Sequence, residues 1–249
     1  MKHILLTGCG GRMGRVVAEI CKNREDLRIC AGVDPTLPNC DFPVYASCTL
    51  VREKADVIID FSFHAAIGDI LEYATKHHIP AVIATTGFNE EELYRIEKAQ
   101  KEIPVFRSAN MSIGVNLICQ LAKKAAKFLP DFDIEIIEKH HNQKVDSPSG
   151  TALMLADEIS SVMPQKMEYN FGRSGICGKR NKNEIGLHAV RGGTIVGEHE
   201  VLFAGSMETV TISHSAGSRE ILANGAVCAA EFILGQKPGA YSMKDIFED

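Results

Sequence analysis

The fold is decided by the opening stretch Lys2-His3-Ile4-Leu5-Leu6-Thr7-Gly8-Cys9-Gly10-Gly11-Arg12-Met13-Gly14. It predicts a strand that runs directly into a glycine-rich turn, and the helical pattern of residues 15–21 follows the turn. Glycines permit the tight turn and let backbone N–H groups approach a pyrophosphate at the N-terminus of the helix. The spacing is a variant, G-x-G-G-x-x-G, because Met13 stands where the third glycine of G-x-G-x-x-G would be. The stretch indicates a dinucleotide-binding unit, although glycine turns between strand and helix also occur where no nucleotide binds.

Asp34 is the second part of this pattern. It follows a predicted strand, residues 28–33, and lies 20 residues after Gly14. An acidic residue at about this distance typically accepts a hydrogen bond from an adenosine ribose hydroxyl. The alternative interpretation is a turn aspartate ahead of Pro35. Arg12 could likewise lie near the adenosine phosphates or be a solvated residue at the start of the helix.

Alternating strands and helices continue through the first half of the chain. Strands are expected at 55–61, 79–87 and 103–109, helices at 64–77 and 90–101, and irregular structure at 35–54. This rhythm predicts an α/β fold, a Rossmann-type doubly wound parallel sheet. Ligands bind outside the carboxyl ends of such strands. The small, polar turns at those ends are Ala84-Thr85-Thr86-Gly87 and Ser108-Ala109-Asn110-Met111, which suit contact with a cofactor but equally suit any loop.

The pattern changes at Ser112. The later segments predict a long amphipathic helix at 113–129, a strand at 133–137 and a helix at 152–163. Three further strands are expected at 184–191, 194–204 and 208–215. Glycine turns join the last three strands, which predicts an antiparallel meander. Residues 164–184 are polar, so we expect a mobile loop whose charges form either a solvated face or an anion clamp. An apolar helix is expected at 220–234, and the tail at 239–246 is expected to pack on the first domain.

Ionisable residues are densest in the stretch Glu138-Lys139-His140-His141-Asn142-Gln143-Lys144-Val145-Asp146-Ser147-Pro148-Ser149-Gly150-Thr151-Ala152. It leads from a strand to a helix whose N-cap is expected to be Ser149. Because a helix N-terminus favours anions, the stretch predicts a site where a negatively charged substrate receives a proton. Three alternatives stay open: one histidine could be ordinary core or surface, Lys144 could be a solvated lysine, and the serines could form a simple turn. A zinc site is disfavoured, because adjacent histidines lack the i, i+4 spacing that places two ligands on one helical face.

Composition narrows the classes of function. The 249 residues are 45% hydrophobic and 24% charged, the balance of a globular protein with one large or two modest domains. A net charge of −5 and a pI near 6.0 give no electrostatic footprint for nucleic acid. No apolar run approaches the roughly 20 residues of a membrane helix, and no signal peptide is recognised ahead of the first strand. The eight cysteines form no Cys-x-x-Cys pair, so we expect reduced thiols in a cytoplasmic protein that binds neither nucleic acid nor membrane.

The central stretch and several others together resemble one family. The others are Gly8–Gly14, Thr85-Thr86-Gly87, Ser108-Ala109-Asn110, Gly186–Arg191 and Asn224-Gly225-Ala226, so the match spans essentially the whole chain. The most specific element is His-His-x-x-Lys-x-Asp-x-Pro-Ser-Gly-Thr-Ala. It is similar to the signature of the dihydrodipicolinate reductase family, also called 4-hydroxy-tetrahydrodipicolinate reductases, which act in the diaminopimelate route to lysine.

The resemblance implies a role for each matching position. The family's proton donor/acceptor falls on His140, its proton-donating lysine on Lys144, and its substrate contacts on His141, Gly150 and Thr151. Its contacts with NADH or NADPH fall on Gly8, Cys9, Gly10, Gly11, Arg12, Met13, Asp34, Ala84, Thr85, Thr86, Ser108, Ala109, Asn110 and Met111. No metal ligand is implied. The family fold implies a dinucleotide-binding domain at 1–111 plus 219–249, and a mixed α/β substrate-binding and oligomerisation domain at 112–218 that assembles a homotetramer.

Two departures from the family pattern concern the cofactor. Some members place an arginine directly after the acidic ribose residue, where this chain has Pro35, so a preference for NADPH does not carry over. Met111 replaces an aromatic residue of some members, which alters packing more than chemistry.

The expected reaction is reduction of a small dicarboxylate. Hydride passes to an α,β-unsaturated cyclic imine formed from 4-hydroxy-tetrahydrodipicolinate, and His140 or Lys144 protonates the resulting enamine to give tetrahydrodipicolinate. One competing hypothesis is another Rossmann-fold NAD(P)-dependent dehydrogenase, acting on an amino acid or an aldehyde. Another is a nucleotide-sensing regulatory protein without turnover.

Overall fold

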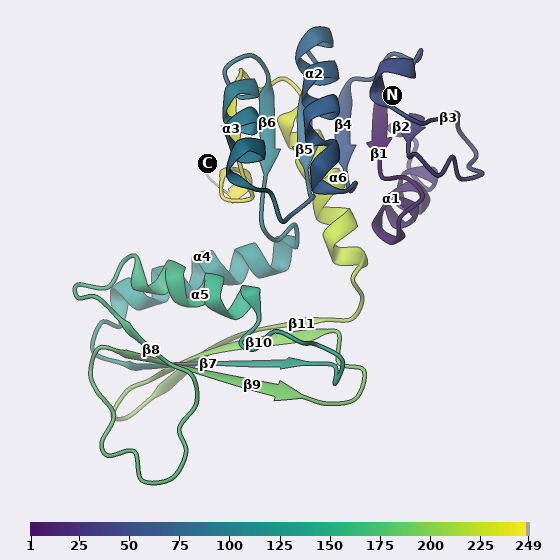
Figure 1. The fold of residues 1–249 in the computed structure, drawn as a ribbon. Helices are drawn as coiled ribbons and strands as arrows, with labels where there is room; N and C mark the ends of the chain where they lie inside the picture. Colours follow the sequence, from purple (N-terminus) through teal and green to yellow (C-terminus); the bar gives the residue numbers. More distant parts are fainter. Residues whose placement is uncertain (248–249) are drawn as a thin grey trace. The chain divides into compact units, whose positions relative to one another are not determined.

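The chain folds into two compact units, each described by itself. The computed structural model describes residues 1–247 (Figure 1). The first unit comprises Met1–Ile113 with Glu220–Asp249, and the second comprises Gly114–Arg219. No helix within residues 1–247 is long and apolar enough to cross a membrane.

The first unit is built on one parallel sheet. Its strands are β1 (Lys2–Thr7), β2 (Leu27–Val33), β3 (Val44–Tyr45), β4 (Val57–Asp60), β5 (Ala81–Ile83), β6 (Pro104–Arg107) and β12 (Gly239–Tyr241). They lie in the order β12-β6-β5-β4-β1-β2-β3, and every pairing is parallel. The strand order reverses direction at β1, with β2 and β3 on one side of it and β4, β5 and β6 on the other, as in a doubly wound nucleotide-binding sheet. The predicted Rossmann-type fold is confirmed, and so is the packing of the tail on this unit, where β12 extends the sheet beside β6.

Helices cover both faces of this sheet. They are α1 (Arg12–Lys22), α2 (Ile67–His77), α3 (Glu90–Ala99) and α6 (Glu220–Ile233), with short 3-10 turns η1 (Cys48–Leu50), η2 (His64–Ala66) and η3 (Asp245–Phe247). Successive side chains of a strand point to opposite faces. Ile4 and Leu6 of β1 therefore join the core beneath α1 and α6, and Leu5 joins the core beneath α2 and α3. Burial on both faces explains the continuous apolar runs of these strands.

Two local predictions in this unit need correction. Helix α1 begins at Arg12, with Gly11 as its N-cap, and not at residue 15, so the glycine turn passes directly into the helix. Residues 35–54 are not wholly irregular, because β3 pairs with β2 and η1 follows it. A two-residue strand at the edge of a sheet is too short to leave a periodic signal in the sequence.

The second unit contains a mixed sheet. Its strands are β7 (Asp133–His140), β8 (Glu168–Asn170), β9 (Glu184–Arg191), β10 (Gly197–Ala204) and β11 (Thr209–Ala216), in the order β11-β10-β7-β9-β8. The predicted meander is wrong: β10 and β11 pair antiparallel, but β7 lies between β9 and β10. The Gly192-Gly193 turn crosses the end of β7, where the N–H of Gly192 donates to the carbonyl oxygen of His140. The turn therefore connects two strands that do not pair.

One face of this mixed sheet carries the core of the second unit. Helices α4 (Ile113–Phe128) and α5 (Gly150–Ser160) contribute to a cluster with Ile134 and Ile136 of β7. Strand β7 extends three residues beyond its predicted end at 137, and its alternation continues, so Glu138 and His140 are buried on the same face as the isoleucines. The strand thus carries two ionisable side chains into the side of the sheet that the helices cover.

Candidate active site and cofactor-binding loops

The glycine-rich loop of the first unit is shaped by close backbone contacts. Gly8 has a φ of +72°, and a Cβ on it would overlap the carbonyl oxygen of Phe61. A Cβ on Gly14 would overlap the carbonyl oxygen of Gly8, so helix α1 can approach β1 only with glycine there. A Cβ on Gly10 would lie 2.9 Å from Oδ2 of Asp34. The loop is therefore packed tightly against the next strands, and its amide groups lie at the N-terminus of α1, where a pyrophosphate is favoured.

Asp34 is held at this loop as a hydrogen-bond acceptor. Its Oδ2 accepts from the N–H of Gly10 at 3.0 Å, and its Oδ1 accepts from the N–H and the hydroxyl of Thr36 at 2.9 and 2.6 Å. Burial raises the pKa of Asp34, but the hydrogen bonds from Thr36 and Gly10 outweigh burial and lower it. The carboxylate is consequently ionised and fixed in place, which an acceptor for ribose hydroxyls requires.

The remaining predicted cofactor positions differ in exposure. Gly11, Arg12, Thr86 and Ala109 are exposed, and Met13, Ala84, Ser108 and Asn110 are partly buried. Cys9, Thr85 and Met111 are buried, with the hydroxyl of Thr85 donating to the carbonyl oxygen of Ser62 at 3.1 Å. Met111 packs in the core beneath α1 and α6, where a Cβ on Gly225 would overlap its carbonyl oxygen. The loops converge on the carboxyl ends of the strands, but the Met111 side chain supports the core.

His140 ends strand β7 and is the buried histidine of the adjacent pair. Its Nδ1 lies 2.6 Å from Oε2 of Glu138. Its ring packs edge-on against His199 of β10, with 5.2 Å between the ring centroids and 74° between the planes. Nε2 has no hydrogen-bond partner within residues 1–247, and a Cβ on Gly197 would come within 3.1 Å of it. Nε2 is therefore the nitrogen that remains available for proton transfer.

Glu138 is fully buried and accepts hydrogen bonds from three residues. Besides His140, these are Arg191 of β9, through Nη1 at 2.8 Å and Nη2 at 2.6 Å, and the backbone N–H of Ser149 at 3.0 Å. Burial raises the pKa of Glu138, but the hydrogen bonds from Arg191, His140 and Ser149 outweigh burial and lower it. A buried carboxylate with these partners stays ionised, because each partner favours its charged form.

Ser149 begins helix α5, and the predicted N-cap is confirmed. Its hydroxyl oxygen accepts from the N–H of Ala152 at 3.2 Å and lies 3.0 Å from Nε2 of His199. Burial and the neighbouring His140 lower the pKa of His199 to about 4, so His199 is neutral at neutral pH. Gly150 is exposed, with no atom within 4 Å of an added Cβ, and Thr151 is partly buried. The N-terminus of α5 is thus fixed at its cap and accessible at its first residue.

Lys144 lies in the loop between β7 and α5 and is ion-paired. Its Nζ is 2.8 Å from Oδ1 of Asp146, and its side chain is only 20% exposed. The hydrogen bond from Lys144 lowers the pKa of Asp146. Arg191 also donates to the carbonyl oxygen of Asp146 at 2.8 Å, so one guanidinium joins this loop to Glu138. Lys144 and His140 therefore belong to one connected network.

His141 belongs to a different group. Its Nε2 lies 3.1 Å from Nη2 of Arg219, and both side chains line a cavity of about 510 Å³ with Thr194 and Ser218. The two adjacent histidines thus face different surroundings, as alternation along a strand predicts.

Several contributors to this site were not predicted from the sequence. Glu138 stands two residues before His140 on the strand, and the period of two could have placed both side chains on one face. The sequence pattern does not predict the contacts of Arg191 and Arg219, because these depend on the pairing of β7 with β9 and on the fold of the whole unit. His199 of β10 is only 4% exposed.

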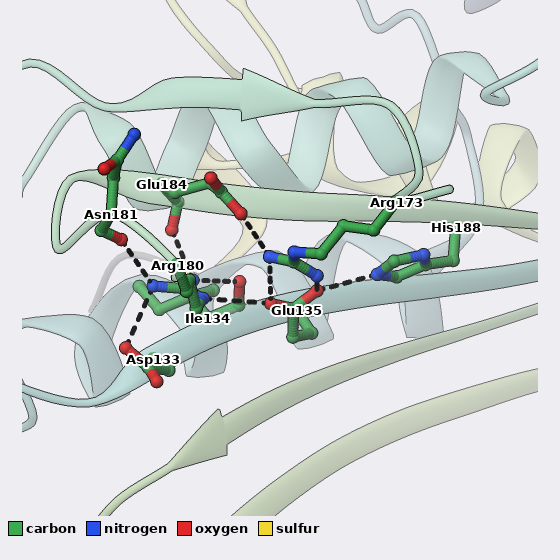
Figure 2. Close-up of polar contacts among 8 residues, drawn as sticks. All are labelled: Asp133, Ile134, Glu135, Arg173, Arg180, Asn181, Glu184 and His188. Carbon is green, nitrogen blue, oxygen red and sulfur yellow. Dashed lines mark hydrogen bonds and ion pairs between the residues drawn. The ribbon is translucent and has the colours of Figure 1, made fainter. Parts of the chain in front are cut away.

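The other face of β7 carries a second ionic cluster (Figure 2). Arg173 and Arg180, from the segment between β8 and β9, donate to both oxygens of Glu135 at 2.9 to 3.1 Å. His188 of β9 contacts Glu135 at 2.7 Å, and Arg173 also pairs with Glu184. The predicted mobile loop at 164–184 therefore needs correction, because it contains β8 and its two arginines fold back onto the sheet.

Together the fold and the site define a two-domain oxidoreductase of the Rossmann class, whose second unit carries the buried network of His140, Glu138 and Arg191. Two family models match almost the whole chain: Dihydrodipicolinate reductase, N-terminus, over residues 2–111, and Dihydrodipicolinate reductase, C-terminus, over residues 114–247. The chain belongs to the dihydrodipicolinate reductase family, a family of oxidoreductases that use NADH or NADPH.

Individual relatives support this assignment over the full length. The chain is 56% identical over 246 residues to a 4-hydroxy-tetrahydrodipicolinate reductase of Caldanaerobacter subterraneus subsp. tengcongensis, covering 99% of this chain and 98% of that one. It is 51% identical over 245 residues to that of Clostridium tetani, covering 98% and 96%. A solved structure of a dipicolinate-bound dihydrodipicolinate reductase from Paenisporosarcina sp. TG-14 is similar with a TM-score of 0.85, at 26% identity and 99% coverage of both chains.

Proposed function

We propose that this chain reduces 4-hydroxy-tetrahydrodipicolinate to tetrahydrodipicolinate, with release of water, in the diaminopimelate route to lysine. The observation that carries the proposal is His140, whose Nδ1 is held by buried Glu138 at 2.6 Å while its Nε2 stays available. The reduction consumes a hydride and a proton. NADH or NADPH supplies the hydride when bound, and the chain supplies the proton.

The first unit holds the nucleotide in this proposal. The amides of the glycine loop bind the pyrophosphate, and Asp34 accepts from the adenosine ribose. The loops at 84–86 and 108–111 complete the contacts at the carboxyl ends of β5 and β6. Pro35 provides no cation for a 2′-phosphate, so we propose that NADH serves at least as well as NADPH.

The second unit holds the dicarboxylate and delivers the proton. His140 or Lys144 protonates the enamine carbon that hydride transfer leaves electron-rich. The open N-terminus of α5 at Gly150 and Thr151 binds one carboxylate through backbone N–H groups, and His141 contributes to substrate binding. Lys144 exchanges Asp146 for a substrate carboxylate, since both are anions of the same kind. Dipicolinate, the ligand named for the relative from Paenisporosarcina, is a dicarboxylate of this class.

We further propose a cytoplasmic homotetramer, as the resemblance implies. Gel filtration combined with light scattering measures the assembly, and a monomer would contradict this part without affecting the proposed reaction.

The decisive experiment follows loss of reduced-nicotinamide absorbance with freshly generated 4-hydroxy-tetrahydrodipicolinate. We expect turnover with NADH and with NADPH, and competitive inhibition by dipicolinate. Matched reactions with an amino acid or an aldehyde in place of the substrate test the other dehydrogenases. A folded protein that oxidises neither nucleotide with this substrate would refute the proposal.

A further inference from the structure

Glu138 links the proposed proton donor to the proposed carboxylate-binding turn. Its Oε2 accepts from Nδ1 of His140 at 2.6 Å, and its Oε1 accepts from the N–H of Ser149 at 3.0 Å. The side chain is only 1% exposed. A single buried carboxylate therefore touches both the histidine and the residue that caps α5.

The charge of Glu138 decides which nitrogen of His140 exchanges a proton. An ionised carboxylate only accepts hydrogen bonds, and the partners of Glu138 lower its pKa. Nδ1 of His140 must therefore carry a hydrogen, which leaves Nε2 as the nitrogen that gains and loses a proton. Nε2 faces the space beside Gly197, where a Cβ would come within 3.1 Å.

Four residues place charged or titratable groups around His140. They are Glu138 of β7, Arg191 of β9, His199 of β10 and, in the following loop, Lys144. Burial and His140 itself lower the pKa of His199 to about 4, so His199 is neutral over the working range. Lys144 is paired with Asp146 at 2.8 Å.

Arg191 moderates the influence of Glu138. Its guanidinium contacts both carboxylate oxygens, at 2.8 and 2.6 Å, and it is the register partner of His140 in the pairing of β7 with β9. A cation bound to the same carboxylate reduces the negative potential at the imidazole. Glu138 and Arg191 thus act on His140 in opposite directions.

We infer that Glu138 is a positioning residue for the proposed reduction: it holds the His140 ring with Nε2 available and places its negative charge against the imidazole, and Arg191 partly offsets that charge. The inference rests on the proposed function, since it concerns the proton that the substrate receives. The direction of the effect expected from each substitution follows from charge alone. Removing the anion destabilises the imidazolium, whereas removing the cation stabilises it.

The test compares pH–rate profiles of Glu138→Gln and Arg191→Met with the wild type. With protonated His140 as the donor, activity falls at alkaline pH as the imidazolium loses its proton. We expect Glu138→Gln to move this alkaline limb to lower pH by about one unit or more, and Arg191→Met to move it to higher pH. Arg191→Lys keeps the charge and should return the limb toward the wild-type position. We also expect kcat of Glu138→Gln at neutral pH to fall about a hundredfold.

Glu135→Gln is the matched control. Glu135 lies on the same strand and also binds a histidine and arginines, but on the opposite face of the sheet. This variant should leave the limb where it is. NADH affinity, measured by fluorescence titration, should be unchanged in every variant that folds.

A second readout does not depend on turnover. Ring ¹⁵N chemical shifts distinguish Nδ1–H from Nε2–H histidines, and we expect the neutral His140 of the wild type to be Nδ1–H. In Glu138→Gln, where the amide can also donate, that tautomer should no longer dominate.

The outcomes separate this inference from the proposed function. A wild-type protein without reductase activity refutes the proposed function. An active wild type in which the two limbs do not move in opposite directions overturns the role of Glu138 and leaves the reductase intact. An Nε2–H tautomer of His140 in the wild type would also overturn it, whatever the activity.

Discussion

Replacing Glu135 with glutamine tests the cluster that holds residues 171–183 against β7. Burial raises the pKa of Glu135, but hydrogen bonds from Arg173, His188 and Arg180 outweigh burial and lower it from 4.5 to about 2. A shift of about 2.5 units corresponds to about 3 kcal/mol of stability at pH 7. Because the pKa is lowered in the folded state, this stabilisation is fully present above about pH 4.5, the ordinary value of this carboxyl, and disappears as the pH falls through about 2.

Urea unfolding followed by circular dichroism, repeated from pH 7 down to pH 3, measures the effect. We expect Glu135→Gln to be about 3 kcal/mol less stable than the wild type at pH 7, with a difference that shrinks below pH 4. Glu198→Gln is the control, since Glu198 pairs with Lys139 where both side chains are about 40% exposed (38% and 42%), and no measurable change is expected. A difference that stays the same from pH 7 to pH 3 would contradict the electrostatic account of the cluster.

Three further predictions concern the proposed reaction. His140→Ala and Lys144→Ala should each lower kcat at least about a hundredfold with NADH affinity intact. The double variant should lose much less than the product of the two single losses in kcat. A variant that keeps more than a tenth of wild-type turnover would show that its residue has only a structural role. Gly150→Val should raise the substrate KM strongly and leave NADH affinity near wild type by titration, whereas an unchanged KM removes this turn from the site. Because Asp34 is ionised, kcat/KM should not favour NADPH over NADH by more than about a hundredfold, roughly 2.7 kcal/mol, and a larger ratio refutes its proposed role.

The sequence predicted those parts of the molecule that depend on near neighbours. The strand, the glycine turn and helix α1 are contiguous, and Asp34 follows at the end of the next strand, so their arrangement needs only one βαβ unit. The cap at Ser149 is equally local. These features could be predicted because their partners lie within a few residues or one strand pairing.

The mixed sheet could not be predicted in the same way. The chain does turn at Gly192-Gly193, but a predicted turn does not determine which strands pair. Strand β7 lies between β9 and β10 in the sheet. Glu138 and Arg191 are 53 residues apart, and only the parallel register of β7 with β9 brings them together. Pairing over such separations depends on tertiary packing, which local periodicity does not report.

Strand β7 carries two carboxylates that are chemically similar but serve different sites. Glu135 and Glu138 each bind a histidine and at least one arginine, and they lie three positions apart, so the alternation of the strand sends them to opposite faces. Only the face of Glu138 also carries the N-terminus of α5, because Ser149 donates to that carboxylate. Pairing shifted by one residue would exchange the faces and turn Glu135 toward the helix-covered side that now carries Glu138. The buried isoleucines of β7 oppose that shift, because it would expose them, so the packing of the core determines which histidine can act as the proposed proton donor.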